Sequence, residues 1–304
     1  MGDKVLCRAG WRDRCLLRLS GRALERLALA TWLMRSVSSP RARWAGRLRY
    51  EWGREHVALS PAHAWRTMAA RELESLVDRR LLVERAAGRA PGWSGLEAAA
   101  HALALAIGTI RDDAGGRPVI VSPFHYVSQF ANVCVIDALR DALRLPGIAI
   151  VSGVAREAYG GLEATLVPNL RVLHTYDETN RNALGLRVLQ ALRRDGVAAV
   201  FADAPPYLMQ RFPMATIEVM MFGRPARIHR GVFTIGARAG AVLLPFHLTL
   251  TAGRVDHRIF APIDLVQADA PQRVADCIER ACIDAYPNWI LAGHPSQYGF
   301  APLR

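Results

Sequence analysis

Two polar residues stand just after apolar runs of the chain, where they could move a proton. His125 follows residues 118–121 (PVIV), and Asp203 follows residues 197–201 (VAAVF). The neutral nitrogen of a histidine can take a proton from an attacking hydroxyl, because its pKa lies near neutral pH. A carboxylate can orient that ring and stabilise the imidazolium that forms. The two residues predict general-base chemistry in which a substrate hydroxyl, rather than a serine or cysteine of the protein, is the nucleophile.

Each of these residues also has a purely structural interpretation. A histidine at a strand end commonly just hydrogen-bonds its neighbours, and an aspartate there commonly caps a turn. The sequence lacks the P-loop, the dinucleotide fingerprint, the nucleophile elbow and the zinc-protease motif. Residues 174–178 (HTYDE) have metal-binding side chains without metal-ligand spacing, so we interpret them as a strand end and a helix cap. We therefore expect no metal ion and no cofactor.

The elements that would position His125 and Asp203 alternate between strands and helices. Strands are expected at 118–121, 147–151, 172–174, 197–201, 217–222, 241–246 and 255–261, and helices at 126–143, 178–194, 231–239 and 269–286. This alternation predicts an α/β fold with a mixed, mostly parallel central sheet flanked by helices, and a helical N-terminal part. Ligands of such sheets bind at the carboxyl ends of the strands.

The composition describes a globular protein with a large core. The chain has 304 residues, of which 51% are hydrophobic and 22% charged, and this excludes disordered, collagen-like and disulfide-scaffold proteins. We expect a basic helical region at 1–92 and an α/β domain at 93–304. The five cysteines include no C-x-x-C pair, which favours a reducing compartment. Apolar stretches are too short to span a bilayer.

Positive charge is concentrated at the start of the chain. The net charge is +12, and residues 1–50 hold twelve basic and three acidic residues. Within them, leucines and Trp32 alternate with arginines over residues 14–33, as in a basic amphipathic helix. The apolar residues concerned are Leu16, Leu17, Leu24, Leu27, Trp32 and Leu33. Such a helix either lies on an anionic membrane or packs its apolar stripe on the protein. No nucleic-acid-binding motif surrounds the tryptophans, so we expect no nucleic acid partner.

Four segments recur in the order known from one enzyme family. They are 95–97 (GLE) with 119–125 (VIVSPFH), 192–203 (LRRDGVAAVFAD), 221–226 (MFGRPA) with the glycine-rich stretch to Pro245, and 286–289 (YPNW). Together they resemble the bacterial lipid A biosynthesis (lauroyl/myristoyl) acyltransferases, as a lysophospholipid-acyltransferase-like member, over residues 93–294. The signature of that family places an acid five positions after the histidine, where this chain has Phe130.

This departure leaves two interpretations of the site. Gln129 lies one helical turn from His125 and could hydrogen-bond the imidazole, but an amide cannot stabilise an imidazolium as a carboxylate does. Either Asp203 alone supplies the acid, or the site has lost or changed its reaction. In the second case the chain would be a non-catalytic homologue that binds an acyl group or a carrier protein and assists a partner enzyme.

The resemblance implies an acyltransferase with His125, Asp203 and Gln129 in its catalytic site. It would move a fatty acyl group from a thioester of acyl carrier protein or coenzyme A to a hydroxyl or amine of a lipid, glycolipid or specialised metabolite. Backbone N–H groups at the start of the helix after His125 would hold the thioester oxygen. The expected substrate-binding residues, including arginines for phosphate, are Ser128, Arg211, Arg224, Arg227 and Arg230. We expect a cytoplasmic protein in peripheral contact with an anionic inner membrane.

Overall fold

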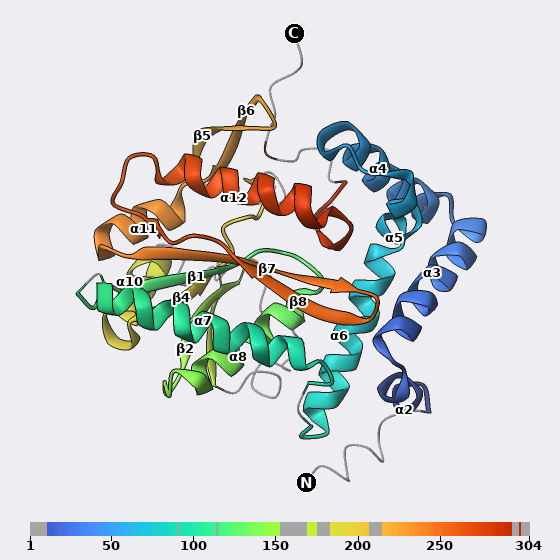
Figure 1. The fold of residues 1–304 in the computed structure, drawn as a ribbon, viewed down its shortest axis with the longest axis horizontal. Helices are drawn as coiled ribbons and strands as arrows, with labels where there is room; N and C mark the ends of the chain where they lie inside the picture. Colours follow the sequence, from blue (N-terminus) through green and yellow to red (C-terminus); the bar gives the residue numbers. More distant parts are fainter. Residues whose placement is uncertain are drawn as a thin grey trace.

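A mixed sheet lies at the centre of the protein (Figure 1). The computed structural model describes residues 11–89, 91–113, 115–152, 169–174, 183–206, 215–293 and 298. Within them the seven-stranded sheet has the order β3-β2-β4-β1-β7-β8, with β9 beside β7. The strands are β1 (Val119–Pro123), β2 (Ile148–Ser152), β3 (Leu170–His174), β4 (Val197–Val200), β7 (Val242–Thr251), β8 (Arg254–Ile259) and β9 (Ile263–Asp264). The pairs β1–β4, β1–β7, β2–β3 and β2–β4 are parallel, and β8 and β9 run antiparallel to β7. The predicted α/β fold is confirmed.

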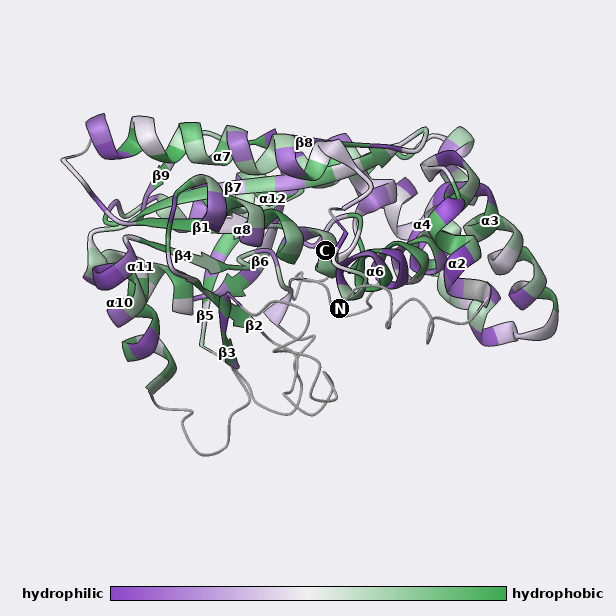
Figure 2. Ribbon diagram, turned by 90° about the horizontal axis from the view of Figure 1, so that it is seen from below, coloured by the Kyte–Doolittle hydropathy of each residue, from purple (hydrophilic) through white to green (hydrophobic). Residues whose placement is uncertain are grey.

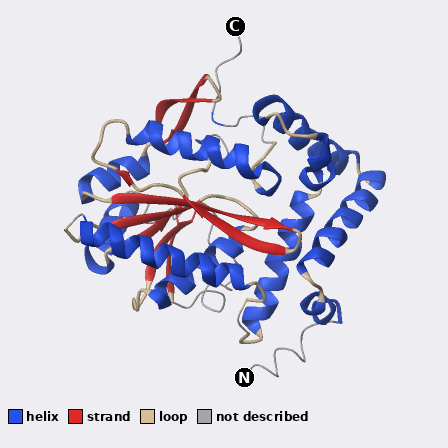
Figure 3. Cartoon of the chain, in the orientation of Figure 1, coloured by secondary structure: helices blue, strands red, loops and turns tan. Residues whose placement is uncertain are grey.

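Helices cover both faces of this sheet (Figure 3). One face carries α7 (Ser94–Asp113) and α8 (Gln129–Ala142), and the other carries α10 (Leu184–Asp195), α11 (Gly231–Ala239) and α12 (Ala270–Ala285). In β1, Val119 and Val121 join one core and Ile120 joins the other. Strands buried on both faces are continuously apolar, which explains the uninterrupted hydrophobic run before His125 and the hydrophobic colour of the sheet in Figure 2.

A hairpin outside the central sheet contains one predicted strand and one that the sequence analysis missed. It consists of β5 (Thr216–Met221) and β6 (Arg224–His229), and the sequence predicted the first of these strands alone. The two linking residues, Phe222 and Gly223, both have positive φ, at 51° and 69°. A two-residue turn of this kind matches the twist of a hairpin. The two arginines of β6, Arg224 and Arg227, are three residues apart and therefore point to opposite faces of the strand.

The N-terminal part consists of five α-helices and a short 3-10 turn within the described residues. They are α2 (Trp11–Arg18), α3 (Gly21–Ser38), α4 (Pro40–Val57), η1 (Pro61–His63), α5 (Ala64–Met68) and α6 (Ala70–Ala86). The predicted single amphipathic helix is two helices, because the Ser20 side chain accepts from the Ala23 N–H and begins α3 anew. Leu24 of α3 and Val77 of α6 share one hydrophobic cluster with α7 and α8. The N-terminal helices are thus packed onto the α/β part through a common core.

The apolar stripe of these helices is divided between the core and the surface. Leu16, Leu24 and Trp32 are buried, whereas Leu27 and Leu33 are exposed. Met34 and Val37 extend the exposed face of α3, with 66% and 84% of their surface accessible. No helix of the described ranges is long and apolar enough to cross a bilayer.

Candidate active site

Two parallel strands bring His125 and Asp203 to the same edge of the sheet. β1 and β4 pair in register, with Val121 opposite Ala199, so the segments that follow them lie side by side. The Ser122 hydroxyl accepts a hydrogen bond from the Ala202 N–H at 3.1 Å and ties the two strand ends together.

Two hydrogen bonds join these residues. His125 Nδ1 lies 2.7 Å from Asp203 Oδ1, and the His125 backbone N–H donates to Asp203 Oδ2, also at 2.7 Å. Asp203 is fully buried, whereas 12% of the His125 side chain is exposed. Tyr298 donates its hydroxyl proton to the Asp203 carbonyl at 2.7 Å. With Nδ1–H held by the carboxylate, Nε2 carries the lone pair, and no described residue bonds to it.

The loop after His125 is tightly constrained. Val127 has φ of 65°, which is strained for a β-branched residue and persists only where the surroundings enforce it. The enforcing group is Asn132, fully buried on α8. Its Nδ2 group donates to the carbonyls of Phe124, Tyr126 and Ser128 at 3.1 to 3.2 Å. Such strained, over-determined loops cluster at functional sites.

Ser128 was expected to bind substrate, but its hydroxyl is already hydrogen-bonded at the start of α8. It is fully buried, caps α8 by accepting from the Ala131 N–H at 2.9 Å, and donates its hydroxyl proton to Asp78. Asp78 also accepts from the Phe130 N–H at 3.3 Å. The expected oxygen-binding site at the start of α8 is therefore reduced to one group. Only the Gln129 N–H has no hydrogen bond in the described part of this turn.

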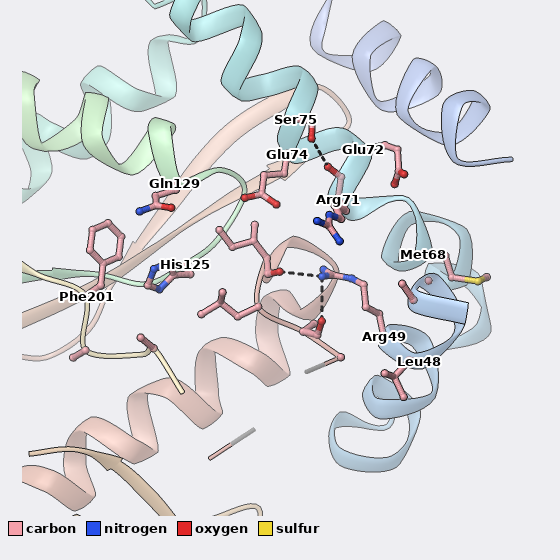
Figure 4. Close-up of a pocket in the computed structure, with 18 of the residues that line it drawn as sticks. Leu48, Arg49, Met68, Arg71, Glu72, Glu74, Ser75, His125, Gln129 and Phe201 are labelled. Carbon is pink, nitrogen blue, oxygen red and sulfur yellow. Dashed lines mark hydrogen bonds between the residues drawn. The ribbon is translucent and has the colours of Figure 1, made fainter. Parts of the chain in front are cut away.

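The Gln129 side chain lines the pocket beside His125 but forms no hydrogen bond with it (Figure 4). The predicted contact is absent among the described residues, and the ring is held by Asp203 through Nδ1 instead. Phe130 packs against the hydrophobic core at the position where the family signature has an acid.

His125 faces a pocket of about 1140 Å³. One side, the strand-end wall, consists of His125, Phe201 and the neighbouring ends of β2 and β4, with apolar residues of α10 and α11. The other side, the helical wall, belongs to α4 and α6 and carries Arg49, Arg71 and Glu74 (Figure 4). His229, the last residue of β6, also lines the pocket. Its ring nitrogens are buried without partners, and burial lowers its pKa.

The arginines predicted for phosphate are not among the lining residues of this pocket, although His229 and Gly231, on either side of Arg230, do line it. Arg227 donates to Thr216 and Glu218 across the hairpin, Arg224 lies 3.5 Å from His56, and Arg230 is exposed at the start of α11. None of these three lines the pocket, and Arg211 lies outside the described residues. β5 and β6 pair with each other in a two-stranded sheet of their own, so closeness in sequence to Asp203 does not make Arg224 and Arg227 part of the pocket lining.

Arginines of the basic N-terminal region line the pocket instead. Arg49 is buried and donates to four backbone carbonyls, those of Thr67, Trp289, Ile290 and Ala292. Its role is to fasten α4 to residues 289–292, which follow α12. Arg41 and Arg71 line the pocket and have no side-chain partner in the described ranges. Because their charges are unpaired, they are the groups available to an anion.

Comparisons with known proteins add no identity to this geometry. Within the described ranges, no three potential metal ligands gather. No family model matches the chain, and no curated protein matches it either.

Proposed function

We propose that the protein is an acyltransferase. It moves a fatty acyl group from a thioester of acyl carrier protein or coenzyme A to a hydroxyl or amine of a lipid, glycolipid or specialised-metabolite acceptor. The observation that carries this proposal is the 2.7 Å contact between His125 Nδ1 and buried Asp203 at a large pocket. It leaves Nε2 as the ring nitrogen available to a substrate in the pocket.

The reaction follows from this geometry. Nε2 removes the proton of the acceptor hydroxyl, and the oxygen attacks the thioester carbonyl carbon. The C–S bond then breaks, and the thiolate takes the proton from Nε2. Asp203 stabilises the imidazolium between the two transfers. The Gln129 N–H is the available backbone donor for the carbonyl oxygen.

The lining of the strand-end wall suits an acyl chain. Leu184 and Val188 of α10 and Val232 and Ile235 of α11 present hydrocarbon to the pocket beside Phe201. Burial of a chain against such groups contributes about 0.8 kcal/mol per methylene. The unpaired arginines Arg41 and Arg71 supply charge for a phosphate of the donor or acceptor.

Release of free thiol from an acyl-coenzyme A or acyl-carrier-protein thioester tests the proposal. We expect slow hydrolysis by the natural protein and a loss of roughly 100-fold or more in His125→Ala. His101→Ala, at an exposed histidine of α7, is the matched control. Equal rates in His125→Ala would refute the catalytic assignment. Thioester binding without cleavage by the natural protein would favour the non-catalytic binder instead, for which Phe130 in place of an acid is the supporting feature.

We also propose that α3 and α4 dock on an anionic membrane. Met34, Val37 and Trp44 expose more than half of their surface next to an arginine-rich segment. Apolar contacts combined with basic charge bind peripheral helices to anionic lipid. Sedimentation with vesicles should show binding that requires phosphatidylserine and weakens in Met34→Ser/Trp44→Ser. Equal pelleting with neutral vesicles at low salt would refute electrostatic docking.

A further inference from the structure

A carboxyl group outside the His125–Asp203 pair lines the pocket together with the proposed base. Glu74 of α6 lines the same pocket as His125 and Gln129, and Figure 4 shows it on the helical wall above them. Arg71 and Asp78 share its side of α6, because residues three and four apart lie on one face of a helix. Nothing in the family signature points to this residue.

Glu74 differs from its acidic neighbours in having no partner. Glu72 pairs with Arg35 at 3.1 Å, and Asp78 holds Ser128 and the Phe130 N–H. Glu74 has neither a hydrogen bond nor an ion pair among the described residues. Glu74 is half-buried and lines the pocket, so its carboxyl oxygens are available to accept hydrogen bonds from a ligand.

The charges around Glu74 restrict what it can bind. Burial and the neighbouring Asp78 raise its pKa to about 7, while Arg49, His125 and Arg71 act in the opposite direction. The two arginines would repel an ammonium group. A carboxylate in this setting favours neutral donors, and hydroxyl groups are the neutral donors that an acyl acceptor would bring.

We infer that Glu74 binds a second hydroxyl of a polyol or sugar acceptor while His125 faces the hydroxyl that is acylated. The inference rests on the proposed function and narrows the acceptor from a hydroxyl or amine to a polyhydroxylated headgroup. Two fixed contacts on one acceptor orient the reacting oxygen, whereas water and simple alcohols have only one hydroxyl to offer.

The ratio of acyl transfer to thioester hydrolysis is the test. The donor is acyl-coenzyme A, the polyol acceptors are methyl glucoside and glycerol, and 1-propanol is the comparison with a single hydroxyl. We expect Glu74→Gln to lower kcat/KM for the polyols about tenfold. Glu74→Ala should lower it further, and hydrolysis and transfer to 1-propanol should stay within twofold. An equal change for all acceptors, or no change, would overturn the inference.

Glu72→Gln is the matched control, since it removes the same charge from the same helix and the same pocket. It should leave the acceptor preference unchanged. The two proposals can fail separately: absent thiol release refutes the acyltransferase, whereas normal thiol release with an unaltered acceptor preference in Glu74→Gln refutes only the role of Glu74. Saturation-transfer NMR of methyl glucoside needs no turnover. Equal signals with the natural protein and Glu74→Ala would overturn the inference even for an inert protein.

Discussion

The two walls of the pocket are organised differently. On the strand-end wall, both oxygens of Asp203 are hydrogen-bonded to His125, and Ser122 ties the strand ends together. On the helical wall, Glu74 and Arg71 have no partner among the described residues. The first wall holds one geometry before any ligand arrives. The second wall offers charges that a ligand must satisfy, so reaction chemistry and substrate recognition have separate structural origins.

The largest expected effect comes from removing the Asp203 carboxylate on the strand-end wall. Asp203→Asn should lower thiol release roughly a thousandfold, because an amide in place of the carboxylate can select the wrong histidine tautomer and stabilises no imidazolium. The measurement is single-turnover cleavage of an acyl thioester, with thermal unfolding as the folding control. A rate of thiol release within tenfold of that of the natural protein would show that the His125–Asp203 pair is not catalytic.

The next effect concerns Arg49, which fastens the helical wall to residues 289–292. Arg49→Met should lower the unfolding free energy by about 3 kcal/mol, because four backbone carbonyls lose their donor in a buried site. Urea denaturation measures this loss, and Arg47→Met, at an exposed arginine paired with Glu51, is the control. Similar losses in both variants would contradict the structural role of Arg49.

Substitution of Glu74 on the helical wall is expected to raise the free energy of unfolding. The folded-state pKa of Glu74 is about 7, above its ordinary value of 4.5, so the native state holds a proton that the unfolded state releases. Stability therefore falls as pH rises from about 4.5 to 7. Glu74→Gln removes this loss and should be more stable than the natural protein at pH 8 by roughly 1 to 3 kcal/mol, but equal at pH 4. Urea denaturation at the two pH values measures this difference. A Glu74→Gln protein that is less stable than the natural protein at pH 8 would contradict the absence of a partner for the Glu74 carboxyl group.

The smallest effect is expected outside both walls. Arg227→Ala should change stability by less than about 0.5 kcal/mol, because its ion pair with Glu218 is exposed. The KM for the acyl donor should stay unchanged, whereas Arg71→Ala should raise it. A large rise in the KM of Arg227→Ala would indicate instead that the β5–β6 hairpin binds the phosphate.

The sequence predicted the strand-end wall well and the helical wall poorly. His125 and Asp203 follow buried parallel strands, and such strands place their ends at one edge of a sheet regardless of distant packing. Glu74 and Arg71 reach the pocket only because α6 packs against α8, and no local pattern states which helix covers which part of a sheet. Ser128 shows the same limit, because its hydroxyl is consumed by Asp78, a residue fifty positions earlier.

A double-mutant cycle on His125 and Asp203 tests the central claim most directly. Thiol release from an acyl thioester would be measured for the natural protein, His125→Ala, Asp203→Asn and the double variant. Residues that act as one unit give non-additive losses. We predict that the double variant is no slower than His125→Ala alone, within about threefold. Losses that multiply, or a His125→Ala protein as fast as the natural one, would contradict the account.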